Sequence, residues 1–375
     1  MPGRTLPLDD SSTSAPYMAT NAPKSTKRVT ISDVAREAGV SIAAVSRILN
    51  NSYDGFSARE ETKERVFAAV KKLGYRPSRA AVRLATGRHN AIGLCYPVYD
   101  SLEGPIDTSS LSQVFRHFDL MLVQHGITRT LKNENMDLVV MPRHGGRSIA
   151  DLISQAQETV DGIIWINPEA NAEDLDAVVA SGIKLAIVGP APVAGDFVNV
   201  RIDETMAGRM VMGHLIVCKA RRILVAIPET RKKEQATVER LEGIRKAVTD
   251  FTDPGLGYET LYLPSDPKKC RAAFAKWLDK SGVPEGILTL GDHVPFAILA
   301  ELHARGLTLP DKLKLAAFEE NLTFLLSTPT ITGLRYPTEE MCFRAATMLM
   351  EYVKTGAVPK PAYMNPQLIA RDSCR

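Results

Sequence analysis

Residues 29–49, with the sequence VTISDVAREAGVSIAAVSRIL, constrain the fold more strongly than any other stretch because their spacing is typical of a helix-turn-helix. Ala35 supplies the small residue that is needed where two helices approach closely, and Gly39 adopts the positive φ of the turn without steric cost. We expect Val45 on the buried face of the second helix. Its expected core companions are Val34, Val40, Ile48 and Leu49.

Two serines are expected to cap these helices, Ser32 before the first and Ser41 at the start of the second. A helix-turn-helix places its second helix in the major groove of DNA, so the motif indicates DNA binding. An ordinary helical hairpin without a nucleic-acid role fits the same spacing. The segments that follow favour the first interpretation.

Residues 60–73 (EETKERVFAAVKKL) predict a third helix, which completes a small three-helix domain. Its apolar residues recur at helical spacing opposite a polar face: Val66, Phe67, Val70 and Leu73. Gly74 follows where a C-cap glycine is expected. Residues 75–88 (YRPSRAAVRLATGR) then alternate arginine with small and apolar residues. This segment is too short to form a stable helix alone, so we expect DNA or a second copy of the chain to order it.

The charge distribution is asymmetric. Residues 24–90 contain 14 Lys or Arg against 6 Asp or Glu, whereas the whole chain has a net charge of only +3. A basic end on a mildly acidic body is typical of a protein that contacts phosphate at that end.

The rest of the chain has the composition of an α/β protein with a buried core, at 45% hydrophobic and 6% aromatic residues. No apolar run approaches the roughly 18 residues of a membrane helix. Residues 1–28 lack an apolar signal segment, and we expect a disordered tail there; whether Met1 or Met18 is the natural start stays open. The five cysteines show no metal-binding spacing.

Beyond residue 90, short β-rich runs alternate with amphipathic helical patterns, which predicts parallel sheets with crossover helices. The expected strands are residues 91–96, 137–141, 162–166, 185–188, 223–227, 286–290 and 313–318. The expected helices include residues 112–133, 205–217, 234–250 and 267–280. No hydrolase, phosphate-loop or dinucleotide motif stands in a suitable context, so an enzyme is not expected and no catalytic residue is assigned.

Residues 29–93 resemble the LacI/GalR family of transcriptional regulators, and the likeness continues more diffusely in RLEGIRKAV, AAFEEN and ARDSC. The resemblance implies an N-terminal all-α helix-turn-helix head and an α/β two-lobed body like periplasmic binding proteins. The expected domains are the tail (1–28), the DNA-binding domain (29–76), a hinge helix (77–90) and an effector-binding and dimerisation body (91–375). The linker around Gly55 is about two residues longer than the family norm, which predicts a surface loop.

By this resemblance, Ile42, Ala43 and Arg47 read the base edges, and Arg47 alone can hydrogen-bond to guanine or grip a phosphate. Leu84 corresponds to the leucine that wedges into the minor groove, with an ordinary apolar residue of a linker helix as the alternative. Thr30, Ser32, Ser46 and Asn50 correspond to positions that contact phosphates or cap helices and set the register on the backbone. Arg83 is placed beside Leu84 for groove or phosphate contact, and Ser41 and Arg79 complete the expected DNA-binding residues.

The resemblance also implies an effector site at the carboxyl ends of the strands of the body. Arg240 corresponds to the arginine that grips the effector in relatives, and Asp292 and Glu319 each follow a strand. Glu319 stands where relatives usually carry Asp, and Gly189 replaces a common acidic residue, so a standard hexose or ribose is not assumed. Alternatively, these polar residues merely cap strand ends.

The predicted function is a sequence-specific transcriptional regulator, expected to be a repressor, whose operator affinity is modulated by a sugar-like or related small molecule bound between the lobes. The alternative is a regulator without an effector, whose body serves only dimerisation. A solute-binding protein is disfavoured by the head. The expected partners are double-stranded DNA with a pseudo-palindromic operator, the effector and a second copy of the chain. We expect no cofactor, metal or membrane contact, and a cytoplasmic location. Whether the effector is an inducer or a co-repressor stays open.

Overall fold

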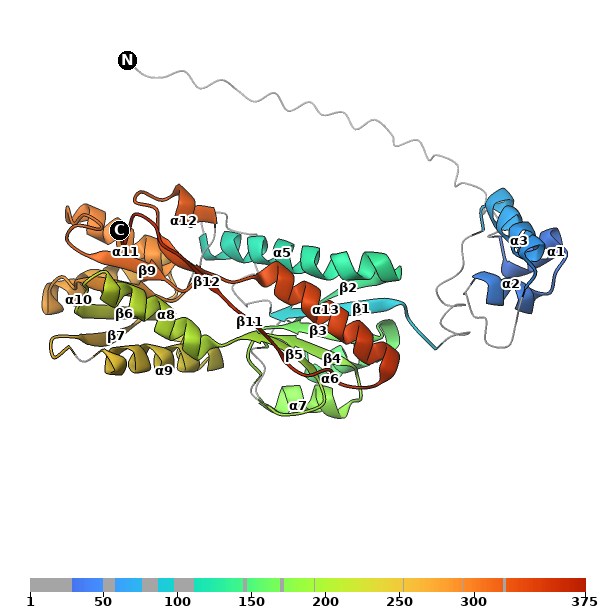
Figure 1. Ribbon diagram of the computed structural model, residues 1–375, viewed down its shortest axis with the longest axis horizontal. Helices are drawn as coiled ribbons and strands as arrows, with labels where there is room; N and C mark the ends of the chain where they lie inside the picture. The colour runs from blue at the N-terminus through green and yellow to red at the C-terminus, as the bar shows by residue number, and fades with distance from the viewer. Residues whose placement is uncertain are drawn as a thin grey trace, which may run out of the picture. The chain divides into compact units, whose positions relative to one another are not determined.

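The computed structural model describes residues 29–49, 58–75, 87–97, 111–143, 147–168, 172–191, 193–251, 253–291, 293–319 and 322–375 (Figure 1). Its contacts divide the chain into two units, Met1–Thr86 and Gly87–Arg375, called the head and the body below. Several sequence predictions lie outside the described residues: the tail 1–28, the loop around Gly55, and the site residues Asn50, Arg79, Arg83, Leu84 and Asp292.

The head contains three helices, α1 (Ile31–Ala38), α2 (Ile42–Leu49) and α3 (Glu60–Leu73), as the sequence predicts. Gly39 ends α1 in the left-handed conformation with φ 64°, which the turn into α2 requires. Val34, Val45 and Val66 are fully buried where the three helices meet. The predicted core companions Val40 and Leu49 are only partly buried.

The prediction for the third helix is wrong at one residue. Phe67 is 51% exposed, whereas Val66 and Ala69 are buried. Because successive helical residues point about 100° apart, a face centred on Val66 and Ala69 leaves Phe67 at its margin. Ala69, which the apolar pattern did not single out, therefore occupies the core position.

The body contains two six-stranded sheets. The first-lobe sheet has the order β11-β5-β4-β3-β1-β2, with β1 (Ala91–Pro97), β2 (Asp137–Arg143), β3 (Gly162–Ile166), β4 (Leu185–Val188), β5 (Val198–Ile202) and β11 (Ala362–Met364). The second-lobe sheet has the order β12-β10-β9-β8-β6-β7, with β6 (Arg222–Pro228), β7 (Gly257–Leu263), β8 (Gly286–Thr289), β9 (Lys314–Ala317), β10 (Thr332–Arg335) and β12 (Gln367–Ile369). All described pairings are parallel except that of β10 with β12.

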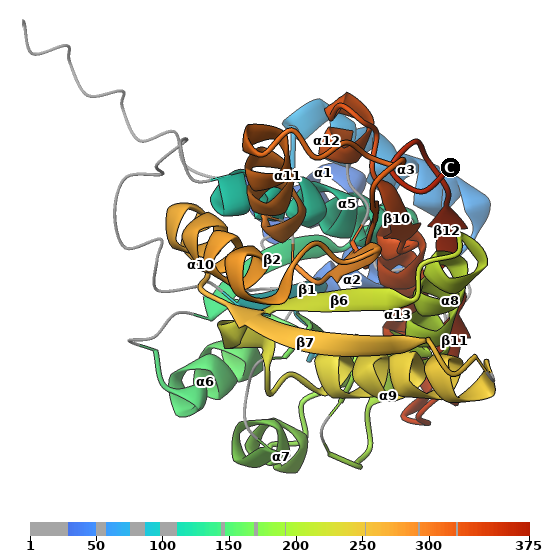
Figure 2. The ribbon, with the colours of Figure 1, turned by 90° about the vertical axis from the view of Figure 1, so that its left-hand side faces the viewer.

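Helices cover both faces of each sheet. The first lobe carries α5 (Leu111–Glu134), α6 (Ile149–Thr159), α7 (Ala172–Ala180) and α13 (Thr338–Thr355). The second lobe carries α8 (Glu204–Val217), α9 (Gln235–Asp250), α10 (Pro267–Ser281), α11 (Val294–Ala304) and the short α12 (Leu322–Leu326). In Figure 2, α8 and α9 lie on the opposite side of β6 and β7 from α10 and α11.

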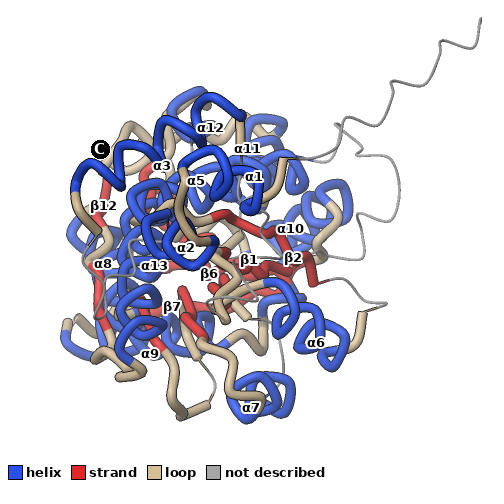
Figure 3. Tube along the Cα trace, turned by 90° about the vertical axis from the view of Figure 1, so that its right-hand side faces the viewer, coloured by secondary structure: helices blue, strands red, loops and turns tan. Residues whose placement is uncertain are grey.

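The alternation of side chains along buried strands explains these layers. In β6, Ile223 and Val225 pack toward α8 and α9, whereas Leu224 and Ala226 pack toward α10 and α11. In the first lobe, one face of the sheet packs against α5 and α13 and the other against α6 and α7 (Figure 3). Trp165 in β3 is 1% exposed, so it is a core residue as predicted.

The chain passes between the lobes three times within the described residues. These crossovers connect β5 to α8, β10 to α13, and β11 to β12. Consequently, α13 packs on the first-lobe sheet although it follows a strand of the second lobe. This interlaced connection is the feature that positions the candidate effector site.

Candidate nucleic-acid interface and effector site

The start of the head is fixed by a capping box around Thr30, not by Ser32. The Thr30 backbone N–H donates to the Asp33 carboxylate at 2.9 Å, and the Thr30 hydroxyl accepts from the Asp33 N–H at 3.4 Å. Hydrogen bonds from Thr30 also hold the pKa of Asp33 below its usual value. The predicted capping role of Ser32 is therefore wrong, since Ser32 already lies inside α1 and is exposed.

The second cap is where the sequence predicts it. The Ser41 hydroxyl accepts a hydrogen bond from the Ala44 N–H at 3.1 Å, and the Val45 N–H donates to the Ser41 carbonyl at 3.1 Å. A serine cap at this point satisfies one of the amide groups that the first turn of a helix leaves unpaired. Ser41 thereby fixes the direction in which α2 leaves the turn.

The two faces of α2 differ sharply in exposure. Val45 and Ile48 are buried against the other helices, whereas Ile42 is 50% exposed, and Ala43 and Arg47 are also exposed. The structure therefore brings all three predicted base-reading residues onto one open face. Ser46 is half-buried beside them.

Ion pairs join oppositely charged side chains on the head helices. Arg36 pairs with Asp33 at 2.7 Å, and Lys72 pairs with Glu37 at 2.6 Å. Among residues 29–49 and 58–75, seven Lys or Arg stand against five Asp or Glu. The strong basic excess of residues 24–90 therefore belongs mainly to the sequence that flanks the three helices.

In the body, the predicted effector residue Arg240 lies on α9 and is 5% exposed. Its Nε donates to Glu204 at 2.9 Å and its Nη2 donates to the other oxygen of the same carboxylate at 3.2 Å. This forked pairing uses the planar geometry of a guanidinium group. Although burial alone would lower it, the carboxylates of Glu204 and Glu319 raise the pKa of Arg240.

Glu319 follows β9 and receives three hydrogen bonds. Arg231 donates to it at 2.6 Å, Arg240 at 3.3 Å, and the backbone N–H of Gly291, after β8, at 2.9 Å. Burial opposes ionisation here, but the two arginines hold the pKa of Glu319 below its usual value. The methylene by which Glu is longer than Asp places the carboxylate within reach of all three donors.

Tyr336 completes this group of side chains. Its hydroxyl donates to Glu204 at 3.2 Å, and its ring lies 5.5 Å from the guanidinium carbon of Arg240. Burial raises the pKa of Tyr336, so the hydroxyl keeps its proton. We call Glu204, Arg231, Arg240, Glu319 and Tyr336 the Arg240 cluster.

The energetic weight of the Arg240 cluster follows from its burial. Removing one partner from a buried ion pair typically costs about 3–5 kcal/mol, whereas exposed pairs contribute about 0–1 kcal/mol. The side chains of Arg240 and Glu204 are 6% and 7% exposed, compared with 54% and 51% for the pair of Arg209 with Asp250. The first pair therefore fixes the structure and the second does not.

Sequence reasoning missed Glu204, Arg231 and Tyr336. Glu204 begins a helix, where an acidic residue is ordinary, and Tyr336 follows a strand end. A buried arginine needs a carboxylate, which is a usable signal, but the sequence alone does not show which of the many carboxylates meets it.

Gly189 follows β4 with φ 114°, and the Asn167 side chain occupies the space where a Cβ would lie.

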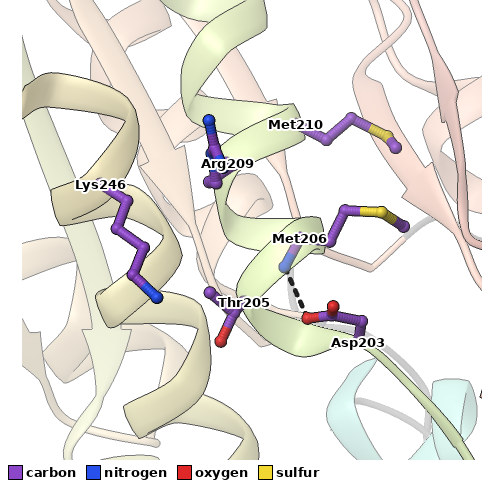
Figure 4. Close-up of a pocket in the computed structure, with 6 residues that line it drawn as sticks. All are labelled: Asp203, Thr205, Met206, Arg209, Met210 and Lys246. Carbon is purple, nitrogen blue, oxygen red and sulfur yellow. Dashed lines mark hydrogen bonds between the residues drawn. The ribbon is translucent and has the colours of Figure 1, made fainter. Parts of the chain in front are cut away.

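A cavity of about 550 Å³ lies on the surface of α8 and α9 (Figure 4). Its lining residues are Asp203, Thr205, Met206, Arg209, Met210 and Lys246. Neither Arg240 nor Glu319 lines it. Its two cationic groups already bind carboxylates, Arg209 to Asp250 at 2.6 Å and Lys246 to Glu242 at 2.7 Å.

A search of the described residues finds no group of His, Cys, Asp and Glu that could hold a metal ion. No disulfide joins the five cysteines in the described part of the chain. No helix among these residues is both long and apolar enough to cross a membrane.

Comparisons with known proteins match both units. The profile described as "Bacterial regulatory proteins, lacI family" matches residues 30–78, and "Periplasmic binding protein-like domain" matches residues 212–374. The HTH-type transcriptional regulator RegA of Clostridium saccharobutylicum is 27% identical over 348 residues, which cover 92% of this chain and 98% of RegA.

Solved structures share the fold. The lac repressor dimer bound to operator and the anti-inducer ONPF has a TM-score of 0.71 at 19% identity, covering 93% of this chain and 99% of that one. The complex of the transcriptional regulator CelR with cellobiose has a TM-score of 0.65 at 23% identity, covering 92% and 100%.

A helix-turn-helix head joined to a two-sheet body with interlaced lobes defines a class of protein, the DNA-binding regulators built on a periplasmic-binding-protein-like fold. Within that class, residues 30–78 match the LacI family of bacterial regulatory proteins, and the whole chain is similar to regulators of that family, as the sequence resemblance implied. Its relatives are regulators and not enzymes, which agrees with the sequence prediction.

Proposed function

We propose that this protein is a sequence-specific repressor that binds a pseudo-palindromic operator as a homodimer and responds to a small neutral, sugar-like effector. The observation that carries the proposal is the division of α2 into a buried face at Val45 and Ile48 and an open face at Ile42, Ala43 and Arg47. A helix with such an open face at the end of a compact head can enter a major groove.

In this proposal, Arg47 reads a base, and Ile42 and Ala43 supply apolar contacts. Thr30, Ser32, Ser41, Ser46 and Asn50 set the register against phosphates. Arg79, Arg83 and Leu84 form a hinge that orders on the minor groove and supplies the wedge.

The proposed effector site lies where the carboxyl ends of β6, β8 and β9 meet, at the Arg240 cluster, and Asp292, which follows β8 in the sequence, is included in the proposal. Arg240 and Arg231 already bind carboxylates there, so the site offers no unbalanced positive charge to an anion. This balance favours a neutral polyhydroxylated molecule, and the structural likeness to CelR with cellobiose supports the same class.

The homodimer is supported by apolar side chains on the surface of the body. Leu322, Leu325 and Leu326 on α12 are 58%, 49% and 74% exposed, and Met121 on α5 is 59% exposed. α5 and α12 lie along the same edge of the body in Figures 1 and 3. Exposed apolar groups of this extent are typical of protein interfaces.

The test is selection of duplexes from a pool with randomised inverted repeats, followed by fluorescence anisotropy on the recovered duplex and on a scrambled one. We expect tighter binding to the selected duplex by about 10³-fold or more. Equal affinity for both duplexes contradicts the proposal.

The effector is tested by calorimetric titration of the full chain with cellobiose and a panel of neutral mono- and disaccharides, each then added to the operator complex. Binding that changes operator affinity supports the proposal, with a coupling of about 1–3 kcal/mol. Operator binding without any response to the panel favours a body that serves only dimerisation.

A further inference from the structure

Residues 87–90 are the first part of the body that follows the sequence of the head, and we call them the exit segment. Gly87 and Asn90 both adopt the left-handed conformation, with φ 68° and 53°. Asparagine is one of the few residues besides glycine that adopts this conformation at low cost. The backbone therefore turns at both ends of the exit segment, immediately before β1 begins at Ala91.

The carboxylate of Asp161 binds the exit segment at two peptide groups. The backbone N–H of His89 donates to Asp161 Oδ1 at 2.7 Å, and that of Asn90 donates to Oδ2 at 2.8 Å. Hydrogen bonds to an ionised carboxylate are roughly twice as strong as those between neutral groups. One half-buried side chain thus fixes two consecutive peptide groups of the exit segment.

Backbone hydrogen bonds complete the arrangement on both sides. The N–H of Asp161 donates to the Ala91 carbonyl at 2.8 Å, so its side chain continues the pairing of β1 with β3 beyond the point where β3 begins. From the other side, the N–H of Asp137 at the start of β2 donates to the Asn90 carbonyl at 3.0 Å. Asn90 is consequently held between two neighbouring strands of the first-lobe sheet.

The place of Asp161 in the fold makes the first lobe the part that directs the exit segment. Asp161 lies between Val160, the C-cap of α6, and β3, whose residues 162–165 are buried. A close-packed strand has little freedom to move independently of its sheet. The two peptide groups bound to Asp161 therefore keep the orientation of the first-lobe sheet.

A fixed exit segment has a consequence for DNA recognition. A dimeric helix-turn-helix protein recognises two half-sites at a set distance, because its two heads are held at a matching distance. A flexible connection lets its ends take many separations, whereas a stiff connection favours one. Fixing the end of the connection that is attached to the body narrows the range of distances that two heads can span.

We propose that Asp161 is a positioning residue that fixes the direction of the exit segment and thereby restricts the half-site spacing that the dimer accepts. The inference rests on the proposed function, in which two heads bind an inverted repeat. The alternative is that Asp161 only satisfies two amides at the end of a strand and has no influence on DNA binding.

The experiment compares the wild type with Asp161→Asn, as full chains, on duplexes with different half-site spacings. Fluorescence anisotropy is measured on the duplex recovered by selection and on duplexes whose half-sites are one or two base pairs closer or farther apart. Asparagine has nearly the same shape as aspartate, but its NH₂ group faces one of the two N–H donors, so only one hydrogen bond can remain. We expect the ratio of the dissociation constants for altered and selected spacing to fall by about fivefold or more, a typical size for coupling between two sites.

The matched control is Asp196→Asn. Asp196 is exposed and precedes β5, and because β3, β4 and β5 are parallel, it lies at the same edge of the sheet as Asp161. Its substitution removes the same charge, so it reveals any effect of net charge on DNA binding. We expect Asp196→Asn to keep the spacing preference of the wild type.

Hydrogen–deuterium exchange of the DNA-free full chain is the second measurement. We expect the amides of His89 and Asn90 to exchange about tenfold faster in Asp161→Asn, because hydrogen bonds to charged groups contribute a free energy of this order. Exchange in β4 and β6 should stay unchanged. Faster exchange throughout the first lobe overturns the proposal, because Asp161 would then support the lobe and not specifically the exit segment. Should Asp161→Asn fail to fold, Asp161→Ser, whose hydroxyl cannot bind both amides, is held to the same results.

A spacing preference in Asp161→Asn equal to that of the wild type also overturns the proposal, since Asp161 then only satisfies a strand end. A wild-type protein without any preference for inverted repeats refutes the proposed function instead. The two failures are distinguishable because the first leaves the wild type selective and the second does not.

Discussion

Arg47 and Val45 are two residues apart on α2 and have opposite environments. Val45 is fully buried against α1 and α3, and Arg47 is exposed on the outer face. The buried residue fixes the rotation of the helix about its axis, which in turn determines that the arginine points outward. In the proposed function, sequence specificity therefore depends on the packing of Val45 as well as on Arg47.

Replacing Arg47 with alanine tests this reading. We expect Arg47→Ala to weaken binding to the selected operator by about 1–3 kcal/mol, because a guanidinium contacts guanine O6 and N7 with two hydrogen bonds. Fluorescence anisotropy on the selected duplex and on variants at each base pair measures the loss.

The matched control is Arg65→Ala, an exposed arginine on α3. It removes the same charge without touching the outer face of α2. If Arg47→Ala leaves the base preference unchanged, Arg47 contacts only the backbone of DNA.

The capping box gives a prediction about stability. Thr30→Ala removes the hydroxyl that accepts from the Asp33 N–H, and loss of such a cap costs about 1 kcal/mol. We expect roughly fivefold faster hydrogen exchange of the α1 amides, and no change for Ser32→Ala, which lies inside the helix. Equal effects of the two substitutions would restore Ser32 as the cap.

The same box predicts a dependence on pH. The pKa of Asp33 is lower in the folded head than in an unfolded chain, because Thr30 donates to its carboxylate. The ionised Asp33 carboxylate therefore contributes its full stabilisation above the pKa that it has in an unfolded chain, about 3.9. This stabilisation is lost as the pH falls through the lower pKa that Asp33 has in the folded head. The protection factors of the α1 amides, that is, their exchange rates relative to an unfolded chain at the same pH, should fall below about pH 4 in the wild type, and less so in Thr30→Ala.

At the level of elements, strong periodic patterns were predictable and short or partly exposed elements were not. Residues 60–73 form α3 with the predicted bounds, and the seven expected strands all occur. β7 was not predicted, and most of its side chains are partly exposed. β5 and β10 were not predicted either, although both are largely buried, so exposure does not account for them. β11 and β12 have three residues each, too few for a pattern to emerge.

The candidate site was predictable in part for a related reason. Arg240 and Glu319 follow local patterns, and the structure brings them within hydrogen-bonding distance. Their connection to Glu204 and Tyr336 depends on crossovers that bring together residues 132 positions apart in sequence. A single sequence carries no signal for this non-local pairing. A buried arginine requires a carboxylate partner, and any carboxylate of the chain could meet that requirement.

The hinge segment gives a prediction at the scale of an element. We expect Leu84→Ala to weaken binding to the selected operator while sparing binding to scrambled duplex, because a wedge acts only where the minor groove is kinked. Fluorescence anisotropy at several salt concentrations distinguishes sequence-specific binding from salt-sensitive, non-specific binding. A parallel loss for both duplexes contradicts the wedge.

At the scale of the whole molecule, the exposed leucines of α12 determine the expected assembly. Leu326→Asp places a charge in the proposed dimer contact, and we expect at least a tenfold weaker dimer, since a buried unpaired charge costs about 1.4 kcal/mol or more. Sedimentation at several protein concentrations measures the change. Val217→Asp on α8, where the native valine is 71% exposed, is the control. If Leu326→Asp leaves the dissociation constant of the dimer unchanged, the dimer interface does not include Leu326.

The interlaced lobes also impose an order on how the chain matures during synthesis. The head is built from residues close together in sequence, so it can form its core as soon as α3 has left the ribosome. The two sheets of the body gain their last strands only from residues 362–369. Neither lobe is complete until translation has passed that point, so a nascent chain exposes a finished DNA-binding unit before it possesses the part that would regulate it.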